Sequence, residues 1–320
     1  MVWALYGDQP ENELLSAMSA TEANWNSLIS EGNLKSKRKI VDVSKALVLL
    51  GALWGIFLLI VSRDAAFIGY FFLFVAFCSF IAFSIVNNMY REACEDYIKL
   101  VFAKENNWCY IGNESEPQQR ILEQTIPELF ARGNTSNKYL DDQFLGAFII
   151  EDKPVPFHFG DFYYEVESGS GKNRHTTPHY NNFFAFKPSN KLNARFLIGP
   201  ESLLLKFGNL FSKKDVNLES IEFNKKFAFS YNNEANKNQI SKIFTPALQL
   251  AFLELGNKRY NFHALISDSY IVFMFDGYLL QKLKTDILND AKINEEDNNQ
   301  LKTRIDELMP IMKEMMAYID

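Results

Sequence analysis

Two apolar stretches that follow each other almost without a break constrain this chain more than any other feature. Residues 43–61 carry one charged side chain, Lys45 near the start, and residues 65–86 carry none. At about 1.5 Å of rise per residue, each helix is long enough to cross the ~30 Å hydrocarbon core of a bilayer. Two core helices of a soluble fold are the alternative, but uncharged stretches of this length are hard to bury in succession. The sequence therefore predicts a transmembrane hairpin.

The short connection, residues 62–64, makes the two spans antiparallel neighbours. Gly51 with Gly55, and Ala65 with Gly69, place small residues four apart. Small residues let helices approach closely in lipid, although glycine is frequent in transmembrane helices in any case. We expect the two pairs to pack the hairpin.

Basic residues set the orientation of the hairpin. The loop carries only Arg63, whereas the two cytoplasm-facing flanks carry Lys35, Lys37, Arg38, Lys39 and Lys45 on one side and Arg91, Lys99 and Lys104 on the other. The positive-inside rule then predicts both termini in the cytoplasm. Transport pathways usually place ionisable groups inside the membrane, so we do not expect a channel or transporter.

The regions flanking the hairpin are predicted to be helical. Residues 8–32 form an amphipathic pattern that ends at Gly32, and the second span is expected to continue past residue 86 as a cytoplasmic helix. The two helices either pack together as a stalk, or the first lies flat on the bilayer. We favour packing, because the polar face of the first helix is acidic and does not suit anionic lipid.

The remainder reads as an α+β domain, mostly antiparallel sheet with helices to one side. A helix is predicted at residues 117–131, and a polar hairpin tip or mobile loop at residues 169–182. Short aromatic and β-branched runs predict strands at residues 144–150, 157–166, 183–186, 195–198 and 221–229.

The C-terminal third is predicted to alternate helices with two strands. Thr245 as cap and Pro246 in the first turn begin a helix that Gly256 ends, and Pro310 is expected to bend the last helix. Strands are predicted at residues 260–266 and 270–275, and helices at residues 278–289 and 295–319. The predicted domains are residues 1–42 (amphipathic helix and basic juxtamembrane segment), 43–86 (transmembrane hairpin), 87–137 (cytoplasmic stalk helices) and 138–320 (soluble domain).

Net charge and cysteine content limit the expected binding partners and the cellular compartment. The net charge is −6 and the pI is near 5.4, so nucleic acid is not an expected partner. The three cysteines, Cys78, Cys94 and Cys109, have neither a disulfide pattern nor metal-like spacing and fit a reducing compartment.

No catalytic, cofactor-binding or metal-binding residue is assigned. His175 and His179, with His158 nearby, are candidate zinc ligands, but Pro178 favours a solvated loop. Asp141 and Asp142 are interpreted as a cap or turn before a strand. Glu165 and Glu167 are interpreted as the wet face of a strand, and His263 as a core or edge residue. Residues 168–171 are too short and isolated for a phosphate loop.

Several segments resemble a known family. The segments that carry the likeness are Glu222 with Phe223, the aromatic stretch 227–229, Thr245 with Pro246, and the aromatic-glycine runs 144–148 and 157–162. The chain is similar here to the bacterial family called domain of unknown function 3137. Its members usually have an arginine just before Thr-Pro, and residues 236–244 contain none. The resemblance implies a bacterial inner (plasma) membrane protein with a two-span anchor and supplies no reaction. It also points to LemA-type membrane proteins as partners, because genes of the two kinds are often neighbours.

Three functions follow as hypotheses. The leading one is a non-enzymatic interaction or scaffold module, anchored in the lipid bilayer, that binds itself as a homo-oligomer or binds another membrane protein. The second is a membrane-tethered hydrolase or ligand-binding enzyme, with a metal-dependent version that uses His158, His175 and His179. The third is a sensor or defence component in which residues 169–182 recognise an effector.

Overall fold

The computed structural model describes residues 31–61, 66–112, 135–150, 152–170, 174–188, 192–204, 212–214, 216–231, 233–258, 261–268, 270–277 and 295–317. The predicted helices at residues 117–131 and 278–289, and nearly all of the one at residues 8–32, lie outside these ranges. The described residues divide into two compact units, one up to residue 102 and the other from residue 103 onward.

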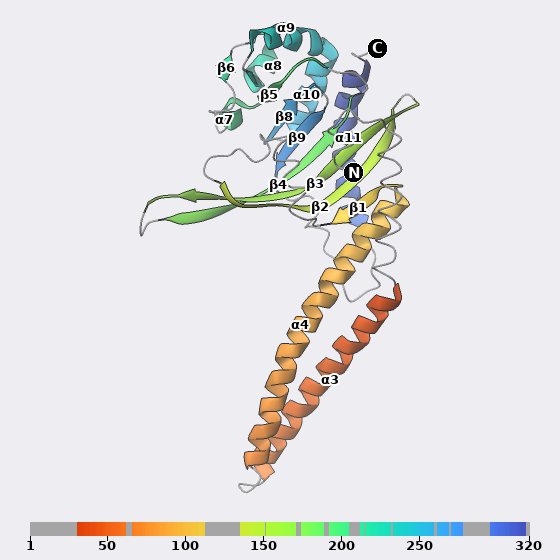
Figure 1. The fold of residues 1–320 in the computed structure, drawn as a ribbon, viewed down its shortest axis with the longest axis vertical. Coiled ribbons are helices and arrows are strands. Elements are labelled where there is room, and N and C mark those ends of the chain that lie inside the picture. Colours follow the sequence, from red (N-terminus) through yellow and green to blue (C-terminus); the bar gives the residue numbers. More distant parts are fainter. Residues whose placement is uncertain are drawn as a thin grey trace. The chain divides into compact units, whose positions relative to one another are not determined.

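Two long helices form the first unit: α3 (Glu31–Val61) and α4 (Ala66–Glu105) (Figure 1). Two windows, Arg38–Ile60 and Phe67–Lys104, are long and apolar enough to cross a membrane. Only 6% and 11% of these windows is buried within the chain, whereas a core helix of a soluble protein is mostly buried. The low burial argues against the alternative of two soluble core helices.

The helix bounds test two sequence predictions in this unit. α4 continues without a break to Glu105, which confirms the predicted continuation past the second span. The predicted stop at Gly32 is wrong, because α3 begins at Glu31 and runs through this glycine. A single glycine costs a helix only about 1 kcal/mol, which the remaining turns offset.

The second unit is built on an antiparallel sheet. The described part of the chain forms nine strands in the order β1-β2-β3-β4-β9-β8-β5-β7-β6, and every pairing is antiparallel. The strands are β1 (Cys109–Gly112), β2 (Thr135–Ile150), β3 (Lys153–Ser168), β4 (His175–Phe186), β5 (Phe196–Gly199), β6 (Ser212–Lys214), β7 (Ala228–Tyr231), β8 (Phe262–Ile266) and β9 (Ile271–Asp276). The predicted α+β class with a mostly antiparallel sheet is confirmed.

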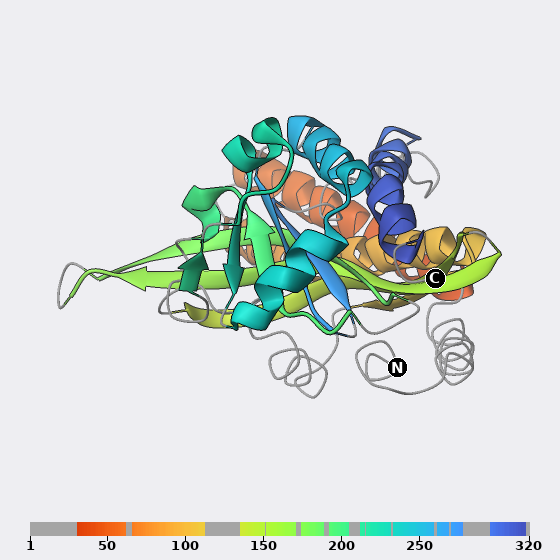
Figure 2. The ribbon, with the colours of Figure 1, turned by 90° about the horizontal axis from the view of Figure 1, so that it is seen from above.

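Helices cover one face of this sheet. Figure 2 shows α8 (Ile221–Lys226), α10 (Pro246–Lys258) and α11 (Glu295–Ala317) on the same side. Phe252 of α10 contacts Phe262 and Phe273 of the sheet, with ring centroids 6.1 and 5.8 Å apart. Two further helices, α7 (Glu201–Leu204) and α9 (Glu234–Ile243), complete the described helices of this unit.

The opposite face of the sheet carries a second apolar cluster. Its members alternate along the strands with the aromatic residues of the helix-covered face, because successive side chains of a strand point to opposite faces of the sheet. They include Leu145, Phe162, Phe183, Leu265, Val272 and Met274. Both faces are therefore apolar over the centre of the sheet.

Three local predictions are corrected by the structure. Residues 221–226 are helix α8, because Ser220 caps it by accepting a hydrogen bond from the Phe223 amide (3.2 Å). Gly256 does not end α10, which runs to Lys258; a Cβ on this glycine would lie 2.8 Å from Phe227 Cζ. Residues 169–182 join β3 and β4 as a hairpin, one of the two predicted alternatives, but the predicted tip is too long, because β4 begins at His175.

The start of α10 and the hairpin that follows it agree with the sequence. The Leu248 amide donates to Thr245 Oγ1 at 3.2 Å, so Thr245 caps the helix as predicted. β8 and β9 form the predicted antiparallel pair, in which Ile266 lies opposite Ile271.

Candidate functional site

Strands β2, β3 and β4 continue past the rest of the sheet as a three-stranded ribbon (Figure 1). The pairing of β9 with β4 ends at Asn181, whereas β3 and β4 stay paired out to Ser168 and His175. We use the term ribbon for residues 135–140, 162–168 and 175–181. It presents side chains on a framework fixed by backbone hydrogen bonds.

Three tyrosines, one from each strand, lie side by side across the ribbon. Tyr163 is the register partner of both Tyr139 and Tyr180. Its ring centroid lies 4.7 Å from that of Tyr139 and 5.3 Å from that of Tyr180. Tyr139 and Tyr180 are 44% and 45% exposed. We call these three residues the tyrosine ladder.

A β-bulge aligns the ladder. The register of β2 against β3 shifts between Ser136 and Tyr139, and Asn137 in between has a φ of 45°. A bulge inserts one residue and re-aims the side chains that follow it. This insertion places Tyr139 opposite Tyr163.

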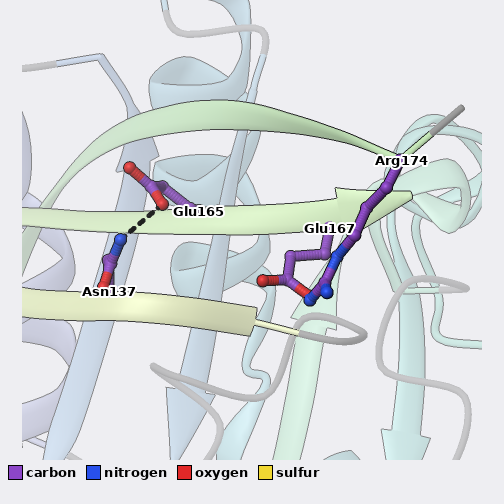
Figure 3. A network of polar contacts seen from close by, with 4 residues as sticks. All are labelled: Asn137, Glu165, Glu167 and Arg174. Atoms are coloured by element: carbon purple, nitrogen blue, oxygen red, sulfur yellow. Dashed lines mark hydrogen bonds and ion pairs between the residues drawn. The ribbon is translucent and has the colours of Figure 1, made fainter. Parts of the chain in front are cut away.

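Polar side chains surround the ladder on the same face. Glu165 accepts hydrogen bonds from Tyr163 Oη at 2.6 Å and from Asn137 Nδ2 at 2.7 Å. Arg174 forms an ion pair with Glu167 further along the strand (Figure 3). The predicted wet face therefore carries two separate sets of polar contacts, one on Glu165 and one on Glu167.

The hydrogen bond to Glu165 changes the ionisation of the central tyrosine. It raises the pKa of Tyr163 from 10.0 to about 12, with burial and the nearby Glu165 charge adding to the effect. Tyr163 is therefore a neutral donor at any physiological pH.

The three histidines predicted as candidate metal ligands are not brought together. In β3 and β4, His158 lies opposite Ala185, while His179 lies opposite Tyr164, six residues further along β3. At about 3.3 Å per residue this separates His158 and His179 by about 20 Å along the strands. His175 instead contacts Ser168, with Nε2 and Oγ 2.7 Å apart. Within the described ranges no group of three His, Cys, Asp or Glu side chains is placed to hold a metal ion.

His158 belongs to a buried polar cluster at the other end of β3. It is fully buried, and its Nε2 lies 3.1 Å from Gln143 Oε1. Burial lowers the pKa of His158 from 6.5 to about 3, so the ring is neutral. His263 in β8 is buried as well, as expected of a core residue.

The neighbouring Asp142 corrects another prediction. Asp141 and Asp142 lie inside β2 and not before a strand. Asp142 sits at a second register shift with a φ of 47° and accepts a hydrogen bond from Tyr110 Oη at 2.8 Å. Its carboxylate therefore ties β1 to β2.

A polar anchor that no sequence motif indicates lies where the ribbon leaves the sheet. Arg304 of α11 donates from Nη1 to Asn182 Oδ1 at 3.3 Å, and its guanidinium carbon lies 4.5 Å from the centroid of the Phe275 ring. Asn182 Nδ2 in turn donates to the Gly277 carbonyl at 2.5 Å. These contacts fasten α11 to the base of the ribbon.

Among the surfaces described, the tyrosine ladder combines exposure, rigidity and polar flanking groups. No family model, curated protein or solved structure matches the chain. The resemblance to domain of unknown function 3137 stays a prediction.

Proposed function

We propose that this chain is a membrane-anchored interaction module whose tyrosine ladder binds another protein, either a second copy or a separate membrane protein. The observation that carries the proposal is the ladder itself. It sets three aromatic rings on paired strands, with both outer rings nearly half exposed.

Tyrosine suits such a surface for physical reasons. Its ring offers a large contact area with few rotatable bonds, and its hydroxyl tolerates both water and a partner. Fully burying an aromatic side chain of this size contributes roughly 1.5–3 kcal/mol. Because the ladder is already ordered by its stacking and by Glu165, binding costs it little conformational entropy.

The anchor in this proposal is the α3–α4 hairpin, crossing a bacterial inner membrane with both termini in the cytoplasm. The length and low burial of the two windows support insertion. The orientation rests on the basic flanks of the spans. The bacterial membrane rests on the family resemblance.

Site-specific crosslinking in native membranes tests the ladder. A photoreactive phenylalanine analogue replaces Tyr139 or Tyr180 in the full chain, and Ile221, which is 72% exposed on α8, provides the control position. We expect a discrete adduct of the same mass from both ladder positions and none from Ile221. The same adduct at all three positions, or no adduct at the ladder, contradicts the proposal.

Cysteine labelling tests the orientation separately. In a chain whose three native cysteines are replaced by serine, Ser62→Cys reports on the loop and Ile221→Cys on the soluble domain. A membrane-impermeant maleimide should label Cys at position 62 in intact cells, and at position 221 only after lysis. The reverse pattern contradicts the proposed topology.

The other two hypotheses gain no geometric support. A metal-dependent hydrolase would need the three histidines together, and β3 and β4 hold His158 and His179 apart. An effector-binding loop at residues 169–182 would be mostly strand β4. Neither is proposed further.

A further inference from the structure

A groove of about 580 Å³ runs between α10 and α11, on a different surface from the tyrosine ladder. Its lining includes the apolar residues Leu250 and Ala251 of α10 and Met309 and Pro310 of α11. Leu250, near the centre of α10, is 57% exposed. The groove is therefore an open apolar surface between two packed helices.

The rim of the groove is acidic. Glu254 of α10 and Asp306 and Glu314 of α11 line it, together with one cation, Lys313. Three carboxylates against one ammonium give a net charge of −2. A partner that fills this groove is favoured if it brings positive charge around an apolar centre.

Pro310 removes one backbone hydrogen bond of α11 beside the groove. It lies inside α11 and has no N–H to donate to the carbonyl of Asp306, four residues earlier. That carbonyl belongs to a residue that lines the groove. A lysine or arginine side chain has the donors to reach both the carbonyl and the carboxylates.

The spacing of the lining residues indicates the shape of the occupant. α10 contributes residues 247, 250, 251 and 254, and α11 contributes residues 306, 309, 310, 313 and 314. Both sets follow the three-and-four spacing of a single helix face. A third helix packs against two such faces by the same ridges-into-grooves geometry that packs helices in general.

We propose that the α10–α11 groove binds a basic amphipathic helix of a partner protein. The apolar side chains of that helix would pack against Leu250 and Met309, and its Lys or Arg side chains would pair with the carboxylates of the acidic rim. The inference is independent of the tyrosine ladder. Either surface can fail its test without affecting the other.

A designed peptide tests the proposal. The probe is a fluorescent synthetic helix of about 18 residues with leucine on one face and lysine on the other. Its binding to the full chain is followed by anisotropy in an uncharged detergent, against empty micelles. The test variant combines Glu254→Gln, Asp306→Asn and Glu314→Gln. The matched control neutralises three exposed carboxylates elsewhere, Asp152→Asn, Glu219→Gln and Glu222→Gln.

We expect the groove variant to weaken binding at least tenfold and the control variant to bind like the unmodified chain. Leu250→Ser should also weaken binding with the rim intact, and Tyr163→Ser should not. Circular dichroism of each variant verifies that the fold is kept. Absence of binding to the unmodified chain, equal affinity of the groove and control variants, or equal binding of a probe with glutamate in place of lysine overturns the proposal.

Discussion

Gly55 of α3 and Gly69 of α4 lie backbone to backbone. A Cβ built on Gly55 would lie 3.1 Å from the carbonyl oxygen of Gly69, and one built on Gly69 would lie 3.2 Å from the carbonyl oxygen of Gly55. The approach is reciprocal, and the same Cβ atoms would lie 2.8 and 2.9 Å from Cγ of Leu73 and Leu59. At these two positions the helices are in contact because neither residue has a side chain.

Gly55→Val should therefore loosen the hairpin. The added side chain needs room that Leu73 and the Gly69 backbone occupy, and overpacking of this kind costs typically about 1–3 kcal/mol. Distances between spin labels on α3 and α4, measured in lipid nanodiscs, should increase. Ala82→Val, on an exposed position of α4, is the control and should change nothing. Unchanged distances in Gly55→Val would show that the close approach is not what holds the pair.

His158 should make the second unit, the one that contains the sheet, less stable in acid. Its pKa is near 3 in the folded chain and about 6.5 when unfolded, so the unfolded state binds the proton first. This contribution is fully present above pH 6.5 and is lost as the pH falls toward 3, by at most about 1.4 kcal/mol per pH unit. Urea unfolding between pH 7 and 4 measures it.

In His158→Gln the side chain no longer takes up a proton, so the slope should fall by up to one proton. The amide can still hydrogen-bond with Gln143, which keeps the local contact. Parallel stability curves for the unmodified chain and His158→Gln would contradict the assignment.

Glu165 should control the ionisation of Tyr163. The pKa of Tyr163 is raised, so the contribution of its hydrogen bond is present below pH 10 and is lost as the pH rises through 12. In Glu165→Gln the charged acceptor is gone, and the pKa of Tyr163 should fall toward 10. The difference in tyrosinate absorbance between each chain and its Tyr163→Phe form isolates this one residue. Glu167→Gln should have no such effect, and an equal shift in both variants would show that general charge, not the hydrogen bond, raises the pKa.

Arg304 should hold α11 against the sheet. Arg304→Met removes the donor to Asn182 and the cation above Phe275, and loss of buried hydrogen bonds of this kind costs about 1–3 kcal/mol. Hydrogen exchange across α11 should accelerate. Lys302→Met, two residues earlier and exposed, is the matched control. Equal exchange rates in the two variants would assign the anchoring of α11 to its apolar contacts instead.

Local patterns predicted the elements whose signals are local. The uncharged stretch after residue 65 indicated a long helix by length alone, and Thr245 with Pro246 indicated the start of α10 because a cap acts within one turn. The predictions failed where distant contacts decide. Residues 175–182 have the polar composition of a hairpin tip or loop, yet pairing with β3 makes them a strand. Gly256 looks like a helix end, yet it lies within α10, where the absence of a side chain leaves room for the ring of Phe227.

The candidate site could not be predicted from the sequence, again because it depends on contacts between distant residues. Tyr139, Tyr163 and Tyr180 come from three strands, and their alignment depends on the bulge at Asn137, which no local pattern announces. Arg304 and Asn182 are even further apart in the chain. The sequence indicated that residues 163–167 form part of a strand, but not what lies across from them.

The proposed role of the tyrosine ladder is tested by mild-detergent extraction of the full, C-terminally tagged chain, followed by mass spectrometry and particle-size analysis. It compares the unmodified chain with a variant in which Tyr139, Tyr163 and Tyr180 are all replaced by serine. We predict a defined homo-oligomer or a stoichiometric companion protein for the unmodified chain, and the loss of that oligomer or companion from the folded variant. A lone monomer from both chains, or the same complex from both, would contradict it.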